Sequence, residues 1–336
     1  MCYINHMETI AQKLLKSSEP AIRYKTLTGV YGLSEDHTMV REAREEIRTC
    51  DRVKALLRHR TKKGEIDTHP YKKWQGAHWT LSILAELGYP GHDPSLIPLR
   101  EQVLNWLFSS QRKSNIRKIN GRIRQCGSIE GNAALTIMKL GMADERVDEL
   151  IGRLVEAQWP DGGWNCDKKP EASHSSFMES WIPLRAMACY GESRKDKSIF
   201  QAIQNTSELL LSHELFKRST DGSVILREFL WLRYPRYWHY DILGALGALS
   251  EASRLNDARC QPALKILKDS FIPSVGYRAN GRYYQLLHPD AAGYSPVDWG
   301  AGIKGKTVMN EFITVEALTI LRKAGIIPDM NLASAL

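Results

Sequence analysis

The 336-residue sequence has no long apolar run and no Cys-x-x-Cys pair. No stretch approaches the roughly 18 consecutive apolar residues of a membrane-spanning helix. Its six cysteines are scattered without a short regular spacing, so we expect reduced thiols rather than a disulfide framework. The N-terminal stretch MCYINHMETIAQKLLKS carries a histidine, a glutamate and lysines where a secretory signal needs a continuous apolar segment. These absences predict a soluble cytoplasmic protein without a transmembrane segment.

Acidic residues are fewer than basic residues: the sequence has 38 Asp and Glu and 46 Lys and Arg, which gives a formal net charge of +8. The basic excess is spread along the chain in short clusters such as RHRTKK, from Arg58 to Lys63. A scattered excess is more typical of a solvated surface than of a nucleic-acid site. We therefore expect no nucleic-acid partner, and the sequence leaves the oligomeric state open.

Strand patterns are also scarce, and helical patterns take their place. Six apolar stretches rich in Leu and Ala recur along the chain, and most end on a Gly or a polar turn, as helices do. These stretches begin at Arg23, His78, Gly131, Met178, His239 and Phe312. Each follows an amphipathic stretch whose apolar positions recur every three or four residues, as in VDELIGRLVEAQ.

Six hairpins of one amphipathic and one apolar helix, repeating at roughly 50 to 70 residues, indicate a repeat architecture. The apolar helices would form an inner layer and the amphipathic helices an outer layer. Such hairpins can stack as an open solenoid or close into a ring. We predict the closed form, an all-α fold with a single (α/α)6 double-ring toroid domain over residues 1–336. Its inner helices would run parallel, with their N-termini at one rim beside long loops.

One stretch carries a family resemblance. QWPDGGW, from Gln158 to Trp164, matches the Gln-x-x-x-Gly-x-Trp pattern of the QW motif. It resembles the repeats of terpene cyclases and of protein prenyltransferase β subunits, both of which are α/α toroids. The whole chain also resembles a family of bacterial proteins called squalene cyclase-like, through PAIRYKTLTGVYGLSEDH, DGGWNC, HSSF and RYWHYD. The resemblance implies a toroid with a central hydrophobic cavity that binds an isoprenoid or a similar apolar molecule.

The QW stretch itself is expected to be structural rather than catalytic. Gln158 can bond to backbone at a helix end, the two glycines allow a tight turn, and a tryptophan can pack between hairpins. A direct catalytic role is the less favoured alternative. The motif residues are Gln158, Asp161, Gly162, Gly163 and Trp164.

The sequence contains no Asp-Asp dipeptide. It therefore lacks both the Asp-x-Asp-Asp acid of protonating terpene cyclases and the Asp-Asp-x-x-Asp motif of ionising terpene synthases, and neither mechanism carries over. We favour an enzyme with cyclase- or prenyltransferase-like chemistry at the rim. A toroid of the polysaccharide lyase or glycosidase kind and a non-catalytic protein-binding scaffold are the alternatives.

A closed ring would bring the starts of the inner helices together, and with them a set of soft metal ligands. Cys126, Cys166, His174 and His239 would form a Cys2His2 site of the kind zinc accepts. The prenyltransferase resemblance also implies zinc, held there by Asp, Cys and His from the starts of inner helices. Asp241 or Glu130 could replace one ligand. The alternative is that the cysteines are small buried residues and the histidines cap helices.

A metal-free site would use His174, His239 and Asp241 as acid and base, and His239 and Asp241 can pair only if His239 precedes the first helical turn. Aromatic residues at the rim would line the cavity, and arginine would hold the anionic head of an apolar ligand. Packing between repeats is the alternative role for the aromatic side chains. The predicted substrate-binding residues are His78, Trp79, Phe177, Trp181, Arg236, Trp238, Tyr240 and Glu311.

Overall fold

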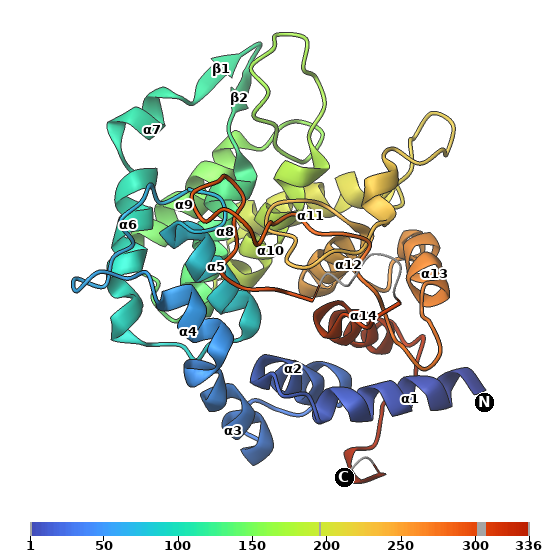
Figure 1. Cartoon of the computed structure of the whole chain (residues 1–336). Coiled ribbons are helices and arrows are strands. Elements are labelled where there is room, and N and C mark those ends of the chain that lie inside the picture. Colours follow the sequence, from blue (N-terminus) through green and yellow to red (C-terminus); the bar gives the residue numbers. More distant parts are fainter. Residues whose placement is uncertain (1, 195, 301–306, 335–336) are drawn as a thin grey trace.

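The computed structural model describes residues 2–194, 196–300 and 307–334, which form an all-α fold (Figure 1). The apolar helices are α2 (Pro20–Lys25) with the π-helical turn η1 (Thr26–Val30), α5 (Ala77–Leu87), α8 (Gly127–Lys139), α10 (Phe177–Ser193), α12 (Ile242–Glu251) and α14 (Glu311–Lys323). The amphipathic helices are α1 (Cys2–Leu15), α3 (Thr38–Glu46), α4 (Asp51–Leu57), α6 (Ile97–Leu107), α9 (Glu145–Ala157), α11 (Lys197–Ser212) and α13 (Gln261–Asp269). All six apolar stretches predicted from the sequence are helical.

Burial separates the two sets of helices. In α8 every residue from Gly127 to Ile137 is buried, whereas α9 buries only one stripe at three- and four-residue spacing. A helix buried on all sides belongs to an interior layer, and a one-sided stripe belongs to a covering layer. Figure 1 shows α6 and α13 at opposite edges of the molecule, with α5, α8, α10 and α12 between them.

The apolar helices pack in chain order. Helix α5 packs on α8, α8 on α10, α10 on α12, α12 on α14, and α14 on η1. Polar caps fix several starts: the Asp241 side chain accepts from the Gly244 N–H at the start of α12, and Asn310 accepts from the Ile313 N–H at the start of α14. The closed double ring remains a prediction, which this order of packing supports.

Short elements complete the described chain. Helix α7 (Ser110–Ser114) leads into the antiparallel pair β1 (Arg117–Ile119) and β2 (Arg122–Arg124), which the sequence pattern did not suggest. Five 3-10 turns are η2 (Ile47–Thr49), η3 (Pro94–Leu96), η4 (Arg227–Leu230), η5 (Ala258–Cys260) and η6 (Leu332–Ser334). Within these residues no helix is both long enough and apolar enough to cross a bilayer.

The QW stretch follows α9 in the chain and is hydrogen-bonded to α11. The Gln158 Nε2 donates to the carbonyls of Gly162 and Ala202 and to the Thr206 hydroxyl, at 2.9 to 3.0 Å. Trp164 is fully buried and its Nε1 donates to the Leu154 carbonyl at 2.9 Å. Gln158 therefore bonds to its own turn and to the neighbouring outer helix. The bracing role of this stretch remains a prediction, which these bonds support.

Asp161, Gly162 and Gly163 determine the conformation of the rest of this turn. The carboxylate of Asp161 accepts from the backbone N–H and the hydroxyl of Ser175, at 2.7 and 2.6 Å. Gly162 has φ +98°, and a Cβ there would lie 2.2 Å from the Asn205 carbonyl oxygen. A Cβ on Gly163 would lie 2.3 Å from the Ser180 Oγ. The turn therefore needs glycine at both positions.

Two long connections meet over the start of α5. The Trp74 indole stacks on Tyr237, with ring centroids 3.6 Å apart, and its Nε1 donates to the Tyr283 carbonyl at 2.8 Å. The Gly293 N–H also donates to the Lys73 carbonyl at 3.0 Å. The segment before α12 and the segment between α13 and α14 are thereby tied to the loop that precedes α5.

Candidate functional site

Three ligating side chains meet at the N-terminal ends of α8 and α10. Cys126 is the N-cap residue of α8, Glu179 lies in the first turn of α10, and Cys166 lies in the connection from α9 to α10. One ligand atom from each lies within 4.8 Å of the others, and both cysteines are free thiols. We call these three residues the rim cluster.

The carboxylate of Glu179 is held in place by Ser128. The backbone N–H and the hydroxyl of Ser128 donate to Glu179 Oε2 at 3.0 and 2.8 Å. The other oxygen, Oε1, lies 3.6 Å from the Sγ of Cys166. Glu179 therefore presents one oxygen to the thiols while the other is fixed by hydrogen bonds, an arrangement common around metal ligands.

The protonation of the rim cluster is coupled. The contact with Cys166 lowers the pKa of Cys126, and the same contact raises the pKa of Cys166. Burial raises the pKa of Glu179, against the two hydrogen bonds from Ser128. Cys166 therefore keeps its proton, which it donates to Glu179 Oε1, and Cys126 is the thiol that ionises first.

Arg112 of α7 adds a positive charge beside the rim cluster. Its guanidinium lies over the Trp106 ring, 5.4 Å from the ring centroid. Its Nε and Nη2 are buried and have no hydrogen-bond partner among the described residues. The contact with Cys166 has the largest effect on the pKa of Cys126, and burial opposes it. The charge of Arg112 lowers that pKa further. The guanidinium therefore has donors free for an anion.

His78, one of the predicted substrate-binding residues, lies on the α5 side of the rim. The Ser82 hydroxyl donates to Asn132 Oδ1 at 3.1 Å, so the Asn132 Nδ2 faces His78 Nε2 at 3.0 Å. The ring proton of His78 is then on Nδ1, which is buried without a partner in the described chain. Burial lowers the pKa of His78 to about 3, so the imidazole is neutral at physiological pH.

Unpartnered buried polar atoms concentrate around the rim cluster. Few buried polar groups in a folded protein lack a hydrogen-bond partner, so each needs an explanation. Within the described residues, the group near the starts of α5 and α8 comprises Gln75, His78, Arg112, Arg124, Gln125 and Glu130. Both carboxylate oxygens of Glu130 are buried without a hydrogen-bond partner in the described chain, and burial raises the pKa of Glu130. Such a concentration indicates a place where solvent or a ligand supplies the missing partners.

The two predicted histidine ligands lie away from the rim cluster. His174 is exposed, and its Nδ1 lies 2.9 Å from the hydroxyl of Ser173 in the turn before α10. The ring of His239 is stacked between Trp238 and Tyr283, at centroid distances of 4.1 and 3.4 Å. The structure thus brings together both predicted cysteines but puts Glu179 beside them. Neither histidine belongs to this group of possible ligands.

His239 and Asp241, which were predicted to pair, each bond to Arg236 instead. His239 does precede the first turn of α12, but its Nδ1 lies 2.9 Å from the Arg236 carbonyl. The Asp241 carboxylate instead accepts from Arg236 Nε at 2.9 Å while it caps α12. Burial lowers the pKa of His239 to about 4. Arg236, not His239, is the partner of Asp241.

The remaining predicted substrate-binding residues have several roles. Trp79 and Tyr240 are buried in the core, and Phe177 packs on Tyr240 at a centroid distance of 5.3 Å. Trp238 stacks on His239, and Glu311 accepts a hydrogen bond from the Ser17 hydroxyl at 2.9 Å. These side chains pack or brace the chain rather than join the rim cluster. Trp181 and Arg236 line the cavity described next.

A cavity of about 470 Å³, here called the central cavity, lies among the apolar helices. Each of the six apolar helical segments contributes to its lining. Its charged lining residues are Lys25, Arg44, Glu86, Lys139, Arg185, Arg236, Glu251, Glu316 and Lys323. The lining is therefore not the hydrophobic one predicted from the sequence, because charges stand on inward faces of otherwise apolar helices.

Comparisons with known proteins give only distant likenesses. No family model and no curated protein matches the sequence. Among solved structures, the apo form of the type II terpene cyclase MstE from Scytonema matches with 13% identity and a TM-score of 0.44, over 96% of this chain and 98% of that chain. A variant of that enzyme in complex with geranylgeranyl dihydroxybenzoate, its substrate, matches with 14% identity and a TM-score of 0.28, over 82% and 95%.

Proposed function

We propose that the chain is an (α/α)6 double-ring toroid enzyme with a zinc site at the rim where its inner helices begin. Cys126, Cys166 and Glu179 are the proposed ligands. The observation that carries the proposal is the approach of their three donor atoms to within 4.8 Å of one another. The ring is supported by the packing of successive apolar helices and by the cavity that all six segments line.

The donor set fits zinc. Two cysteine sulfurs and one carboxylate are accepted zinc ligands, and three protein ligands leave a fourth position for water or substrate, as in catalytic zinc sites. The two hydrogen bonds from Ser128 leave the Oε1 of Glu179 free to face the thiols. When bound, zinc supplies Lewis acidity and lowers the pKa of a group in the open position.

Arg112 supplies the proposed recognition of the substrate. Its free Nε and Nη2 can form the paired hydrogen bonds that carboxylate and phosphate groups accept. Tyr71 and Trp106 lie nearby, with ring centroids 5.5 Å apart, and offer apolar faces beside that anion. The Nδ1 proton of His78 and the unpartnered carboxyl of Glu130 provide further polar contacts. The substrate class is therefore a small molecule with an anionic head.

An isoprenoid-like substrate with cyclase- or prenyltransferase-like chemistry is the narrower version of this proposal. Its anionic head would bind to Arg112, and its reacting group would occupy the open zinc position. The ion pair of Arg185 and Glu251 in the wall of the central cavity disfavours a long apolar tail there, because an apolar group would remove water from these charges and offer no hydrogen bond in return. We therefore favour a compact, amphipathic substrate over a long hydrocarbon.

The test is the zinc content of purified protein after reduction and equilibration with zinc, measured by mass spectrometry in wild type, Cys166→Ser and Glu179→Gln. Cys189→Ser is the matched control, because Cys189 lies near the opposite end of α10. We expect one zinc per chain in the wild type and the control, and its loss in both ligand variants. Zinc-free wild type, or a Cys126–Cys166 disulfide that persists under reduction, would overturn the proposal. Far-UV circular dichroism verifies that each variant is folded.

A further inference from the structure

The lining of the central cavity has more positive than negative groups. Six cations and three carboxylates face it, and Asp241, which pairs with Arg236, lies just behind. We infer that the central cavity is a second binding site, distinct from the rim cluster, for a small aromatic organic anion. This inference goes beyond the proposed zinc site and does not depend on it.

Most of the charges in the cavity wall already have partners. The Arg185 guanidinium donates to both oxygens of Glu251, at 2.6 and 2.9 Å, and to Glu86 at 2.8 Å. Lys139 approaches Glu251 at 3.3 Å. Burial raises the pKa of Glu86, but the charges of Arg185, Lys139 and Lys25 outweigh it and hold that pKa below its usual range. This network is ionised and internally neutralised at physiological pH.

Arg236 forms a second satisfied group. It donates to both Asp241 oxygens, at 2.9 and 3.0 Å, and also bonds to Glu316 of α14. Arg44, near the edge of the cavity, pairs with Glu35 at 3.1 Å. These ion pairs account for every carboxylate in the lining. The positive excess must therefore come from other lining residues.

The excess belongs to Lys25 and Lys323. Both line the cavity, from α2 and α14, and within the described residues neither side-chain ammonium group has a hydrogen bond or an ion pair within 4 Å. Lys25 is half-buried and Lys323 is exposed, so their ammonium groups can meet an anion at little desolvation cost. An anionic group between α2 and α14 would complete the charge balance of the cavity.

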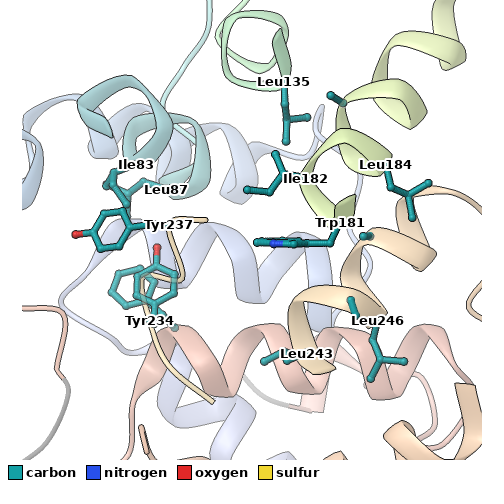
Figure 2. Packing of buried hydrophobic residues seen from close by; sticks show 14 of the residues in the cluster. Ile83, Leu87, Leu135, Trp181, Ile182, Leu184, Tyr234, Tyr237, Leu243 and Leu246 are labelled. Carbon is teal, nitrogen blue, oxygen red and sulfur yellow. The ribbon is translucent and has the colours of Figure 1, made fainter. Parts of the chain in front are cut away.

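The rest of the wall suits an aromatic body. Trp181 is 3% exposed and lines the cavity, and Figure 2 shows its indole projecting from α10 toward Tyr234 and Tyr237. Leu243 lies on the neighbouring wall (Figure 2). The volume of about 470 Å³ falls within the roughly 300 to 1,000 Å³ of small-molecule sites. An aromatic ring against Trp181 with its anion at the lysines fits these contacts.

Gly247 gives a means of closing the cavity without disturbing the fold. It lies in α12 and lines the cavity, and a Cβ added there would meet nothing within 4 Å. Gly152, in the exposed face of α9, is equally unobstructed. Because each glycine is inside a helix, replacing it should not lower helix propensity. Gly247→Phe would fill the cavity, and Gly152→Phe is its matched control.

The test uses anilinonaphthalene sulfonate, a fluorescent aromatic anion, in a binding titration. We expect saturable binding of one probe per chain to the wild type and to Gly152→Phe. Gly247→Phe should bind at least about tenfold more weakly. Equal binding to both phenylalanine variants would overturn the inference, as would the absence of saturable binding to the wild type. Thermal unfolding of each variant verifies that it is folded.

A second variant tests the charge by replacing the two lysines with uncharged side chains of similar length. The double substitution Lys25→Met with Lys323→Met should weaken binding of the probe about tenfold, as expected for two partly solvated charge contacts. Phenylnaphthylamine, a neutral molecule with a similar aromatic body, should bind correspondingly weakly to the wild type. Unchanged binding to the double variant, or equal binding of the neutral molecule, would contradict an anion site.

Cys166→Ser separates this inference from the zinc proposal. The rim cluster lies at the starts of α8 and α10, whereas Lys139 and Arg185 line the cavity further along the same helices. The variant should lose zinc and bind anilinonaphthalene sulfonate like the wild type. Loss of the probe together with zinc would place the probe at the rim cluster and overturn a second site.

Discussion

Glu179 Oε1 lies 3.6 Å from the Sγ of Cys166, while Glu179 Oε2 accepts two hydrogen bonds from Ser128. One carboxylate thus joins the connection between α9 and α10 to the first turn of α8. Ser128 touches no proposed metal position and acts only through Glu179. It is a positioning residue, so removing its hydroxyl should weaken metal binding and leave the stability of the fold unchanged.

Ser128→Ala should weaken zinc binding about 10- to 100-fold, the usual effect of removing a group that orients a metal ligand. Competition with a chromogenic chelator measures the affinity. Ser270→Ala is the control, since the Ser270 hydroxyl, at the C-terminal end of α13, also donates one short hydrogen bond, to the Ile266 carbonyl at 2.8 Å. An affinity unchanged in Ser128→Ala would mean that Glu179 is not a ligand.

Zinc should protect two particular thiols from alkylation. A thiolate bound to a metal is a poorer nucleophile than a free one, so Cys126 and Cys166 should react more slowly with iodoacetamide once zinc is added. Cys50 and Cys189, which are free and outside the rim cluster, should react at the same rate in both conditions. Peptide mass spectrometry gives each rate. Equal rates for Cys126 with and without zinc would speak against its role as a ligand.

The brace at the QW stretch should be sensitive to a single methyl group. Gly162→Ala forces a Cβ to within 2.2 Å of the Asn205 carbonyl at a φ of +98°. We expect a loss of about 2 to 4 kcal/mol in the free energy of unfolding, from backbone strain and the clash together. Gly222→Ala has a similar φ of +71° with nothing within 4 Å, so it should cost only about 1 kcal/mol. Urea denaturation compares them, and equal losses would show that the clash does not matter.

Arg185 should set the acid sensitivity of the fold. Burial raises the pKa of Glu251, but the Arg185 and Lys139 charges outweigh it and lower that pKa to about 2. The unfolded value is about 4.3, so this contribution is complete above about pH 5 and is lost as the pH falls through about 2. Because the Glu251 side chain is about one-third exposed, the contribution should be at most a few kcal/mol.

Arg185→Met removes the partner of both carboxylates. The variant should be less stable than wild type at pH 7 and should lose less stability, or gain some, between pH 5 and pH 3, because protonation then relieves two partly buried carboxylates that have lost their arginine partner. Lys265→Met breaks the exposed pair with Asp269 and should leave the wild-type pH profile unchanged. Urea denaturation at each pH gives the comparison. Parallel profiles for wild type and Arg185→Met would contradict the account.

The sequence predicted helices well because their burial is periodic. The apolar stretch at Phe312 became α14 and the stretch VDELIGRLVEAQ became the one-sided α9. The β1–β2 pair was missed because RKI and RIR carry no alternating apolar pattern. Short polar strands of this kind are fixed by their neighbours rather than by their own residues.

The site was harder to predict than the helices. Cys126, Cys166 and His78 were expected at the rim, but Glu179 was not, because the predicted ligands were the soft donors cysteine and histidine. An acidic residue in the first turn of an apolar helix, as in MESW, was the available signal. The position of His239 depended on its stacking with Tyr283, 44 residues further along the chain, which no local pattern reveals. The charged cavity could have been inferred from Arg185 and Glu251, which interrupt apolar helices.

The most direct measurement of the central claim is X-ray absorption at the zinc edge of the reconstituted protein. The proposed site predicts two sulfur ligands at about 2.3 Å and oxygen ligands at about 2.0 to 2.2 Å. Glu179→Gln should change this first shell or lose the metal, while His174→Ala and His239→Ala should leave it unchanged. Imidazole scattering that disappears in either histidine variant, or a first shell without sulfur, would contradict a zinc site made by Cys126, Cys166 and Glu179.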